Sequence, residues 1–350
     1  MRNEIGSILT NNYAFGGPFP KPDFAIELCM CDTHAKWYQA ISEIEGIPLF
    51  CLEGIISQWE TSGESKKVVQ LKIDYLTNQL LEAIDWMIKT SGREFDDEKF
   101  IQGMINSIDS AVYWARTAYL NRAIPAPLDE KSMFTLYALS IINRARQEVA
   151  DFYRELLDEV QDRVDNRIAA SPYEKCRLIS DCQPPWHALG IFRALESYGA
   201  VSVGAHYSMG LAGGWEYDKE DDTWNPTKTV KEMGIELKTR EDATRALADF
   251  LIRTSSVARA VRFNGEGLNR RTMDIYNKWH AEGVIVHLNR GCEGIALGQM
   301  EMVHFLQEQG IPTLTYEGNH ADPREFDEPR TLARIESFME TLGLKKIVED

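Results

Sequence analysis

The spacing of apolar residues divides the chain into three stretches. Two short apolar runs at residues 23–29 and 47–52 flank a segment with helical spacing, which predicts a strand, a helix and a strand. From residue 66 to residue 170, apolar residues recur every three or four positions, which predicts long amphipathic helices, the last at about residues 130–168. After Pro172 the pattern alternates between strands and helices to the end of the chain.

The C-terminal stretch has short β-branched runs separated by helical segments. We expect strands at residues 176–181, 200–206, 284–288 and 313–316, helices at 187–198, 240–252, 268–282, 296–309 and 331–342, and an acidic loop at 217–225. Alternation of this kind is typical of α/β folds, and we predict two doubly wound parallel-sheet domains with a large helical insertion. The N-terminal α/β domain with the helical block would span residues 1–170, and the C-terminal α/β domain residues 171–350.

Two cysteines occupy equivalent positions in this pattern. Cys292 lies between Gly291 and Gly294, after one predicted strand and before a helix, and Cys31 follows the strand at 23–29 in the same way. Open α/β sheets bind ligands at the carboxyl ends of their strands, and a helix start lowers the pKa of a thiol. Each cysteine is therefore a candidate ligand or reactive group, the alternative being an inert loop cysteine. Cys51 lies inside a predicted strand, where we expect it to pack.

Composition narrows the function and the compartment. The chain has 350 residues, a formal net charge of −16 and a pI near 5.0, which argues against general binding to nucleic acid or to an anionic membrane. No apolar run is long enough to span a membrane and the N-terminus lacks a signal peptide, so we expect a cytoplasmic protein. In a reducing cytosol the six cysteines would remain thiols that are available to metal.

Thiolates from two strand-to-helix turns, meeting across an interdomain cleft, would suit an iron–sulfur cluster or zinc. Cys29-x-Cys31 is too short to identify a metal, and structural zinc is disfavoured because Cys31 and Cys292 are far apart in sequence. The chain has no dinucleotide-binding glycine fingerprint, Walker sequence or nucleophile elbow.

Polar and aromatic residues near the ends of the predicted strands are candidates for a substrate pocket: Trp186, His206, Glu317 and His320. The alternative for the charged loop at residues 322–327 is that it caps the last helix. We expect His287, inside a strand, to be packed rather than to bind a ligand.

Four motifs carry a resemblance to a known family: C-D-T-H-A-K-W-Y from Cys31, D-C-Q-P-P-W from Asp181, N-R-G-C-E-G from Asn289 and Y-E-G-N-H-A-D-P-R-E-F-D from Tyr316. In this order and separation they resemble the 2-hydroxyacyl-CoA dehydratase and benzoyl-CoA reductase family over nearly the whole chain. The helical block and the first and last motifs look closer to the cluster-bearing subunit of benzoyl-CoA reductase.

The resemblance implies a [4Fe–4S] iron–sulfur cluster held by three cysteines, of which two fall on Cys31 and Cys292. The third position falls before Met1, and truncation of the chain is the explanation we favour. The alternatives are that Cys29 or Cys182 substitutes, or that the cluster is incomplete. The partners implied are a homologous cluster-bearing subunit, an ATP-dependent electron-donating activator and an acyl-CoA substrate.

The chemistry implied by the resemblance is one-electron reduction of a CoA thioester. Our first expectation is a subunit of an anaerobic enzyme that reduces an aromatic acyl-CoA, as in benzoyl-CoA reductase, and the alternative is a subunit of an (R)-2-hydroxyacyl-CoA dehydratase. A hypothesis of another class is a cluster-free scaffold subunit. A cysteine about three residues before Met1 would favour the enzyme, and its absence the scaffold.

Overall fold

A computed structural model describes residues 2–13, 16–29, 31–54, 65–254 and 265–347. In chain order the elements are α1 (Arg2–Thr10), β1 (Ala25–Cys29), α2 (Asp32–Glu45), β2 (Leu49–Glu53), α3 (Lys66–Ser91), α4 (Asp97–Leu120), α5 (Glu130–Leu136), α6 (Leu139–Ile142), α7 (Gln147–Asp165), β3 (Cys176–Asp181), the 3₁₀ turn η2 (Trp186–Ala188), α8 (Ile191–Glu196), β4 (Ala200–Ala205), α9 (His206–Gly210), β5 (Trp215–Asp218), β6 (Thr223–Pro226), α10 (Arg240–Arg253), α12 (Gly265–Lys278), β7 (Gly283–Asn289), α13 (Glu293–Ala296), α14 (Gln299–Glu308), β8 (Thr313–Gly318), η3 (Pro323–Glu325) and α15 (Glu328–Thr341).

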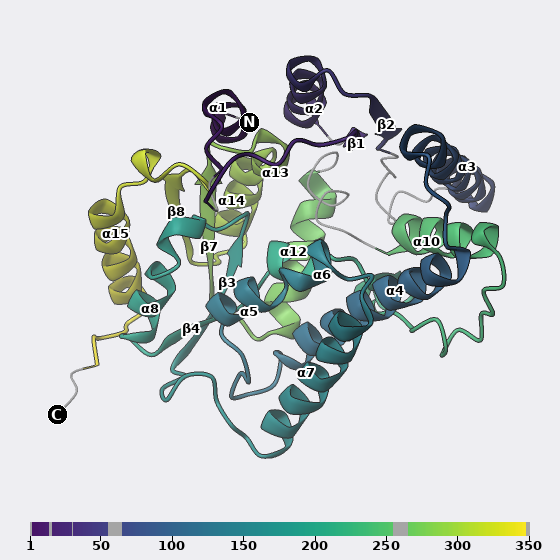
Figure 1. Cartoon of the computed structure of the whole chain (residues 1–350). Coiled ribbons are helices and arrows are strands. Elements are labelled where there is room, and N and C mark those ends of the chain that lie inside the picture. Colours follow the sequence, from purple (N-terminus) through teal and green to yellow (C-terminus); the bar gives the residue numbers. More distant parts are fainter. Residues whose placement is uncertain (1, 14–15, 30, 55–64, 255–264, 348–350) are drawn as a thin grey trace.

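Within the described residues, the main sheet has four parallel strands in the order β4-β3-β7-β8. Strand β3 connects through α8 to β4 on one side, whereas β7 connects through α14 to β8 on the other side. Because parallel crossovers are right-handed, these connections place their helices on opposite faces of the sheet. Figure 1 shows α8 next to α15 along one face, with α12 and α14 on the other.

The chain leaves β3 and β7 in opposite directions, although these two strands are neighbours. We call the carboxyl ends of these two strands the switch point. Ligands of open α/β sheets bind at such a place because the departing loops diverge there. Cys182 directly follows β3, and Cys292 lies in the turn after β7, so both cysteines belong to the switch point.

A smaller sheet consists of β1 and β2, which pair in parallel with α2 between them in the chain. Strand, cysteine-bearing turn, helix and strand therefore follow one another here as they do from β7 to β8. The rings of Phe50 in β2 and Trp86 in α3 pack with centroids 5.4 Å apart. Helix α3 in turn packs on α10 through a separate apolar cluster made by Ile73, Leu76, Ala248 and Ile252. Both sheets are parallel, which confirms the predicted α/β class.

The helical block differs in detail from the sequence-based prediction. The expected helix at 130–168 is wrong as a continuous helix, because the chain forms α5, the short α6 and α7. Asn143 and Arg146 leave the helical region at φ −133°, ψ 20° and φ −82°, ψ 143°, although the apolar spacing continues past them. Similarly, the helix expected at 187–198 splits into η2 and α8, and His206 begins α9 instead of ending a strand.

The acidic loop expected at residues 217–225 is also wrong, because β5 and β6 form an antiparallel hairpin there. Tyr217 faces Trp224 across the hairpin, and their ring centroids lie 4.8 Å apart. Trp215 and Trp224 are fully buried, so packing of these aromatic rings overrides the turn-like composition of the segment.

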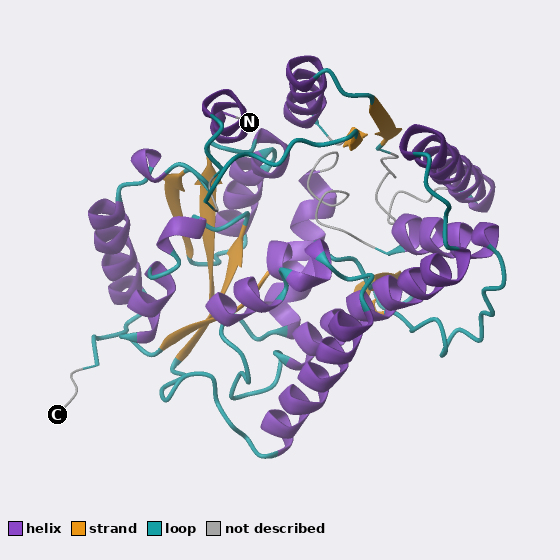
Figure 2. Cartoon of the chain, viewed as in Figure 1, coloured by secondary structure: helices purple, strands orange, loops and turns teal. Residues whose placement is uncertain are grey.

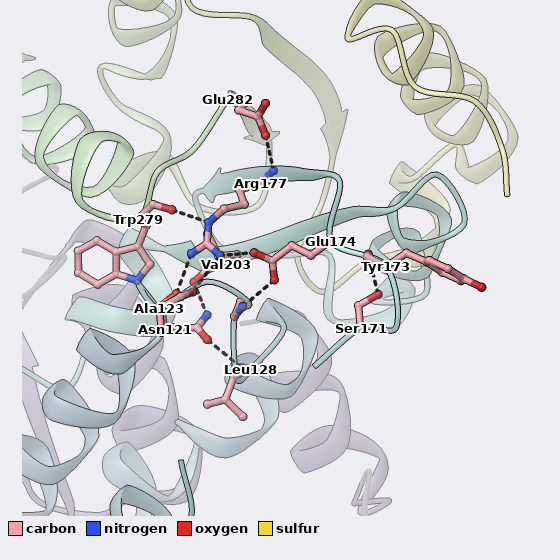
Figure 3. Close-up of polar contacts among 11 residues, drawn as sticks. Asn121, Ala123, Leu128, Ser171, Tyr173, Glu174, Arg177, Val203, Trp279 and Glu282 are labelled. Carbon is pink, nitrogen blue, oxygen red and sulfur yellow. Dashed lines mark hydrogen bonds and ion pairs between the residues drawn. The ribbon is translucent and has the colours of Figure 1, made fainter. Parts of the chain in front are cut away.

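Figure 3 shows how a buried arginine joins the helical block to the main sheet. Arg177 in β3 forms an ion pair with Glu174, and both side chains are more than nine-tenths buried. Its guanidinium also donates to the backbone oxygens of Trp279 at 2.7 Å, Asn121 at 3.0 Å and Ala123 at 3.0 Å. These carbonyls follow α12 and α4, so one charge fastens both helix ends to the start of β3.

One continuous core includes Trp114 of α4 and Tyr153 of α7 together with the strands of the main sheet. Figure 2 shows these helices beside the strands. The division of the chain at residue 170 stays a prediction. Among the described residues, no helix combines the length and the apolar character needed to cross a membrane.

Candidate functional site

Two thiols lie at the switch point. Cys182 is buried and has a left-handed backbone, φ 75°, which residues other than glycine rarely adopt. Cys292 is partly buried, and its carbonyl accepts the N–H groups of Ile295 and Ala296 as α13 begins. Burial raises the pKa of the Cys182 thiol, and the charges of Asp181 and Cys292 raise it further. Because Cys182 follows β3 and Cys292 follows β7, the two thiols lie after the carboxyl ends of neighbouring strands.

Asn289, the last residue of β7, links the loops that surround these thiols. Its Oδ1 accepts the N–H of Gly291 at 2.9 Å and that of His320 at 3.2 Å. Its Nδ2 donates to Oε1 of Gln183 at 3.2 Å, and Nε2 of Gln183 donates to the Tyr207 hydroxyl at 3.0 Å. One network thus connects the loops after β3, β7 and β8 to the start of α9.

The imidazole of His320 packs on the residue that precedes Cys292. A Cβ atom on Gly291 would lie 2.5 Å from Nδ1 of His320 and 2.6 Å from Oδ1 of Asn319, so glycine permits this close approach. Nδ1 of His320 also lies 3.2 Å from Oδ1 of Asn289. Because an amide oxygen only accepts, Nδ1 carries the hydrogen and Nε2 is an acceptor. Burial lowers the pKa of His320, which favours the neutral ring.

Aromatic rings form a wall beside these loops. Trp186 stacks on Tyr137 with centroids 6.1 Å apart, and Tyr207 packs edge-on against both rings at 6.0 Å and 5.6 Å. The backbone N–H of Trp186 donates to the carbonyl of His320 at 3.2 Å, which holds the wall against the loop after β8. Trp186 remains 36% exposed, so the wall offers apolar surface to a ligand.

The two histidines that are buried among the described residues are packed in different ways. His287 stacks on Tyr316 with centroids 4.8 Å apart, and its Nδ1 lies 2.5 Å from the carbonyl of Gln183, which confirms the expected packing role. Burial lowers the pKa of His287 to about 4. Nε2 of His206 lies 3.2 Å from Oγ1 of Thr272 in α12, and burial lowers its pKa to about 3. A pocket role for His206 stays a prediction.

Glu317 lies beside a different hollow, a cleft of about 540 Å³ between β8 and α15. It forms an ion pair with Arg290, and both side chains are more than half exposed. The charged loop that follows does cap the last helix, because the Asp327 side chain accepts the N–H of Arg330 at 3.0 Å. The structure thus joins Trp186 and His320 at one site and directs Glu317 to another.

Cys31 lies in the N-terminal unit, at the turn between β1 and α2. It has an extended backbone, φ −159° and ψ 164°, and a partly buried thiol. Its pairing with Cys292 stays a prediction.

Within the described ranges, the set of three ligand groups within 4.8 Å of one another is instead Glu27, Cys29 and Cys51. The expectation that Cys51 packs is wrong, because β1 is the only strand of the described residues that pairs with β2, and Cys51 is exposed. Burial raises the pKa of Cys29 to about 11, and Glu27 and Cys51 contribute to the shift.

Sequence reasoning did not find Asn289, Gln183 or Tyr207. The signal for Asn289 was available, since it is the first polar residue after the β7 core and opens the N-R-G-C-E-G motif. Gln183 lies within the D-C-Q-P-P-W motif, whereas Tyr207 belongs to no motif. The contact between these two residues could not be predicted, because it depends on how two distant turns meet.

The donor atoms at the switch point suit a thiophilic metal group. Cys182 and Cys292 offer two sulfur ligands, which favour iron–sulfur clusters or zinc over hard cations. The adjoining aromatic wall adds apolar surface, and a site with little solvent exposure helps to keep a cluster at low potential. The chemical type of these ligand atoms therefore fits an iron–sulfur cluster.

Comparison with known proteins identifies relatives across most of the chain. The profile of the family described as 2-hydroxyglutaryl-CoA dehydratase, D-component, matches residues 1–342. The (R)-2-hydroxyisocaproyl-CoA dehydratase alpha subunit of Clostridioides difficile is 26% identical over 337 residues, which cover 93% of this chain and 73% of that protein. The (R)-phenyllactyl-CoA dehydratase alpha subunit of Clostridium sporogenes is 26% identical, with coverages of 95% and 74%.

The alpha subunit of (R)-2-hydroxyglutaryl-CoA dehydratase from Acidaminococcus fermentans is also 26% identical, over 92% of this chain. The chain spans 61% of the length of that relative. All three relatives are dehydratase subunits, so the comparisons favour the dehydratase alternative over our first expectation of a benzoyl-CoA reductase.

Proposed function

Because the chain belongs to the 2-hydroxyglutaryl-CoA dehydratase D-component family, we propose that it is the cluster-binding subunit of an (R)-2-hydroxyacyl-CoA dehydratase. The reaction removes the hydroxyl group from C2 and a proton from C3 of the acyl group, which gives a 2-enoyl-CoA and water. The observation that carries the proposal is the convergence of thiols, an aromatic wall and a neutral histidine at the switch point.

A [4Fe–4S] cluster would be held by Cys292 and Cys31, with Cys182 as a further ligand. Cys182 is the candidate among the described residues because it directly follows β3, the strand that pairs with β7 before the turn of Cys292. When bound, the cluster supplies low-potential one-electron chemistry at an iron site. Cys29 is the weaker substitute, since it belongs to the group with Glu27 and Cys51.

The chain's own residues would bind and orient the thioester. The wall of Trp186, Tyr137 and Tyr207 presents apolar surface on which the acyl chain can pack. His320 is fixed through Nδ1 to Asn289, so Nε2 is an acceptor that can take a proton. Its position next to Gly291 places it at the turn of Cys292.

The proposed partners follow from the chemistry and from the relatives. The relatives are named as alpha subunits, which supports assembly with a second, homologous subunit. A one-electron step at low potential needs an external donor, and we assign that role to an ATP-dependent activator.

The first test is anaerobic purification of the protein with its partner subunit, followed by iron and acid-labile sulfide assays and low-temperature EPR. We expect about four irons for each copy of this chain and their loss in Cys292→Ser. Cys176→Ala is the matched control, because Cys176 lies at the opposite end of β3. A wild-type chain that folds without iron would contradict the enzymatic role and favour the scaffold.

The second test concerns the proposed base. His320→Ala should lower kcat for dehydration by roughly 100-fold or more, with intact iron content. The same assay on His206→Ala tests the other histidine, and an unchanged rate would remove His206 from the pocket.

A further inference from the structure

The small sheet places three metal-binding side chains on one face. Glu27 and Cys29 are two residues apart in β1, and successive side chains of a strand point to opposite faces, so these two share a face. Cys51 in β2 is the register partner of Glu27. Parallel neighbours in register direct their side chains to the same side of the sheet, which brings Cys51 to the other two.

The three ligand groups are close together and unequally exposed. One carboxylate oxygen of Glu27 and the Sγ atoms of Cys29 and Cys51 all lie within 4.8 Å of one another. Sγ of Cys51 lies 3.9 Å from Oε2 of Glu27. The Glu27 side chain is 1% exposed, whereas Cys51 is at the surface. The cluster therefore has a buried carboxylate and one side that solvent can reach.

The carboxylate of Glu27 lacks the hydrogen bonds that burial demands. Within the described part of the chain, Oε1 of Glu27 has no hydrogen-bond partner, and the contact of Oε2 is to a thiol, a weak donor. A buried acid left in this state is costly. A cation bound between the oxygen and the two sulfurs would supply the missing partner.

We propose that Glu27, Cys29 and Cys51 form a Zn²⁺ site, with water as the fourth ligand on the exposed side. Two thiolates and a carboxylate match the ligands that zinc accepts in tetrahedral sites. Binding displaces the protons of the two thiols into solvent, and no electron transfer is involved. This Zn²⁺ site is separate from the proposed iron–sulfur cluster and goes beyond the proposed function.

The position of these three ligand residues gives Zn²⁺ a structural role. A two-stranded sheet is marginally stable by itself, and α2, which connects the two strands, has no buried residue. A metal that joins the end of β1 to the middle of β2 would cross-link the strands. It would thereby stabilise the small sheet from which the turn of Cys31 departs.

The test is a Zn²⁺ titration of the complete protein, treated with a chelator and kept anaerobic under a phosphine reductant. A colorimetric chelator competes for Zn²⁺, and Co²⁺ serves as a spectroscopic probe whose charge-transfer absorption reports thiolate ligation. We expect wild type to bind one equivalent of Zn²⁺ that Cys51→Ser does not bind, and the thiolate absorption of Co²⁺ to be lost in that variant. Glu27→Gln should weaken Zn²⁺ binding but keep the absorption.

Cys31→Ser is the matched control, because it removes a nearby thiol that is outside the cluster of three. It should keep the Zn²⁺ equivalent and lose iron, whereas Cys51→Ser should lose Zn²⁺ and keep iron. Equal Zn²⁺ binding by wild type and Cys51→Ser would overturn the proposal. So would loss of Zn²⁺ in Cys31→Ser alone, or a Cys29–Cys51 disulfide that persists under the reductant. Equal melting temperatures of metal-free wild type and Cys51→Ser would establish that the variant folds.

Discussion

Glu130 is a fully buried acid that three serine hydroxyls hold in place beneath the switch point. Ser180 of β3 donates to its carboxylate at 2.7 Å, Ser202 of β4 at 2.5 Å and Ser208 of α9 at 3.2 Å. Burial raises the pKa of Glu130 to about 7, even though the three hydroxyls favour the charged form. One side chain of α5 therefore links the strands and the helix that carry the site.

This environment predicts a pH dependence of stability. Because the pKa of Glu130 in the folded state lies above the ordinary value of 4.5 for a glutamate side chain, the native state binds the proton more tightly than the unfolded chain does. The Glu130 contribution is fully present below about pH 4.5 and is lost as the pH rises through about 7, by roughly 3 kcal/mol at most. Urea unfolding of wild type and Glu130→Gln across this range would measure the effect.

The variant should show a flatter pH profile, because glutamine cannot ionise but keeps an oxygen that can accept from the serines. Glu155→Gln, on the exposed side of α7, is the control and should follow wild type. Parallel profiles for wild type and Glu130→Gln would show that the carboxylate does not titrate in this range.

At the residue scale, the sequence identified the groups whose chemistry is distinctive and missed those defined by contact. Cys292 stood out through its flanking glycines, and the structure gives a reason for one of them, since a side chain at Gly291 would overlap His320. The exposure of Cys51 could not be predicted, because it depends on how many strands the small sheet has. The unusual backbone of Cys182 has no sequence signature either.

At the scale of elements, the contacts of Arg177 explain how the helical block is attached to the sheet. Its guanidinium reaches carbonyls at the ends of α4 and α12, and Glu174 balances its charge. Glu174 also accepts the N–H of Ala126 at 2.6 Å. The attachment therefore depends on a buried ion pair. Removing one partner of this pair leaves the charge of the other buried and uncompensated.

We predict that Glu174→Ala lowers the free energy of unfolding by about 3–5 kcal/mol, because it leaves the Arg177 charge buried and unbalanced. Replacing both partners, as Glu174→Leu with Arg177→Met, should cost less than the single change. Glu236→Ala removes an exposed ion pair with Lys238 and should change the free energy of unfolding by less than about 1 kcal/mol. Chemical denaturation at neutral pH measures all three, and a loss below about 1 kcal/mol in Glu174→Ala would contradict the prediction.

Elements with a single clear signal were predicted well, and those set by tertiary packing were not. β3 was predicted with the bounds that the structure shows, because it is a continuous buried run between polar turns. The helix predicted at residues 296–309 begins only at Gln299, because Gly298 adopts φ 79° and separates α14 from the short α13. The β5–β6 hairpin depends on the burial of Trp215 and Trp224 in the core. The acidic composition of the turn between the two strands does not indicate this burial.

At the scale of the whole molecule, two parallel units carry the proposed cluster ligands separately. Cys31 follows β1 of the small sheet, and Cys292 follows β7 of the main sheet. The sequence predicted this repetition of strand, cysteine, helix and strand, and both parallel pairings confirm it. The relative position of the two turns depends on the packing of α3 on α10 and of α10 on α4, which no motif encodes.

If one cluster binds both cysteines, it cross-links the two units, and a substitution in one unit should affect the other. Helix α2 has no buried residue, so its amides should exchange rapidly in the cluster-free protein. Cluster loading should slow exchange in α2 of wild type and of Cys176→Ala, but not in Cys292→Ser, although Cys292 lies in the other unit. Hydrogen–deuterium exchange by mass spectrometry, before and after anaerobic reconstitution, makes this measurement. Unchanged exchange in α2 of cluster-loaded wild-type protein would mean that the cluster does not use Cys31. The ligands would then have to come from the main sheet and the loops that follow its strands.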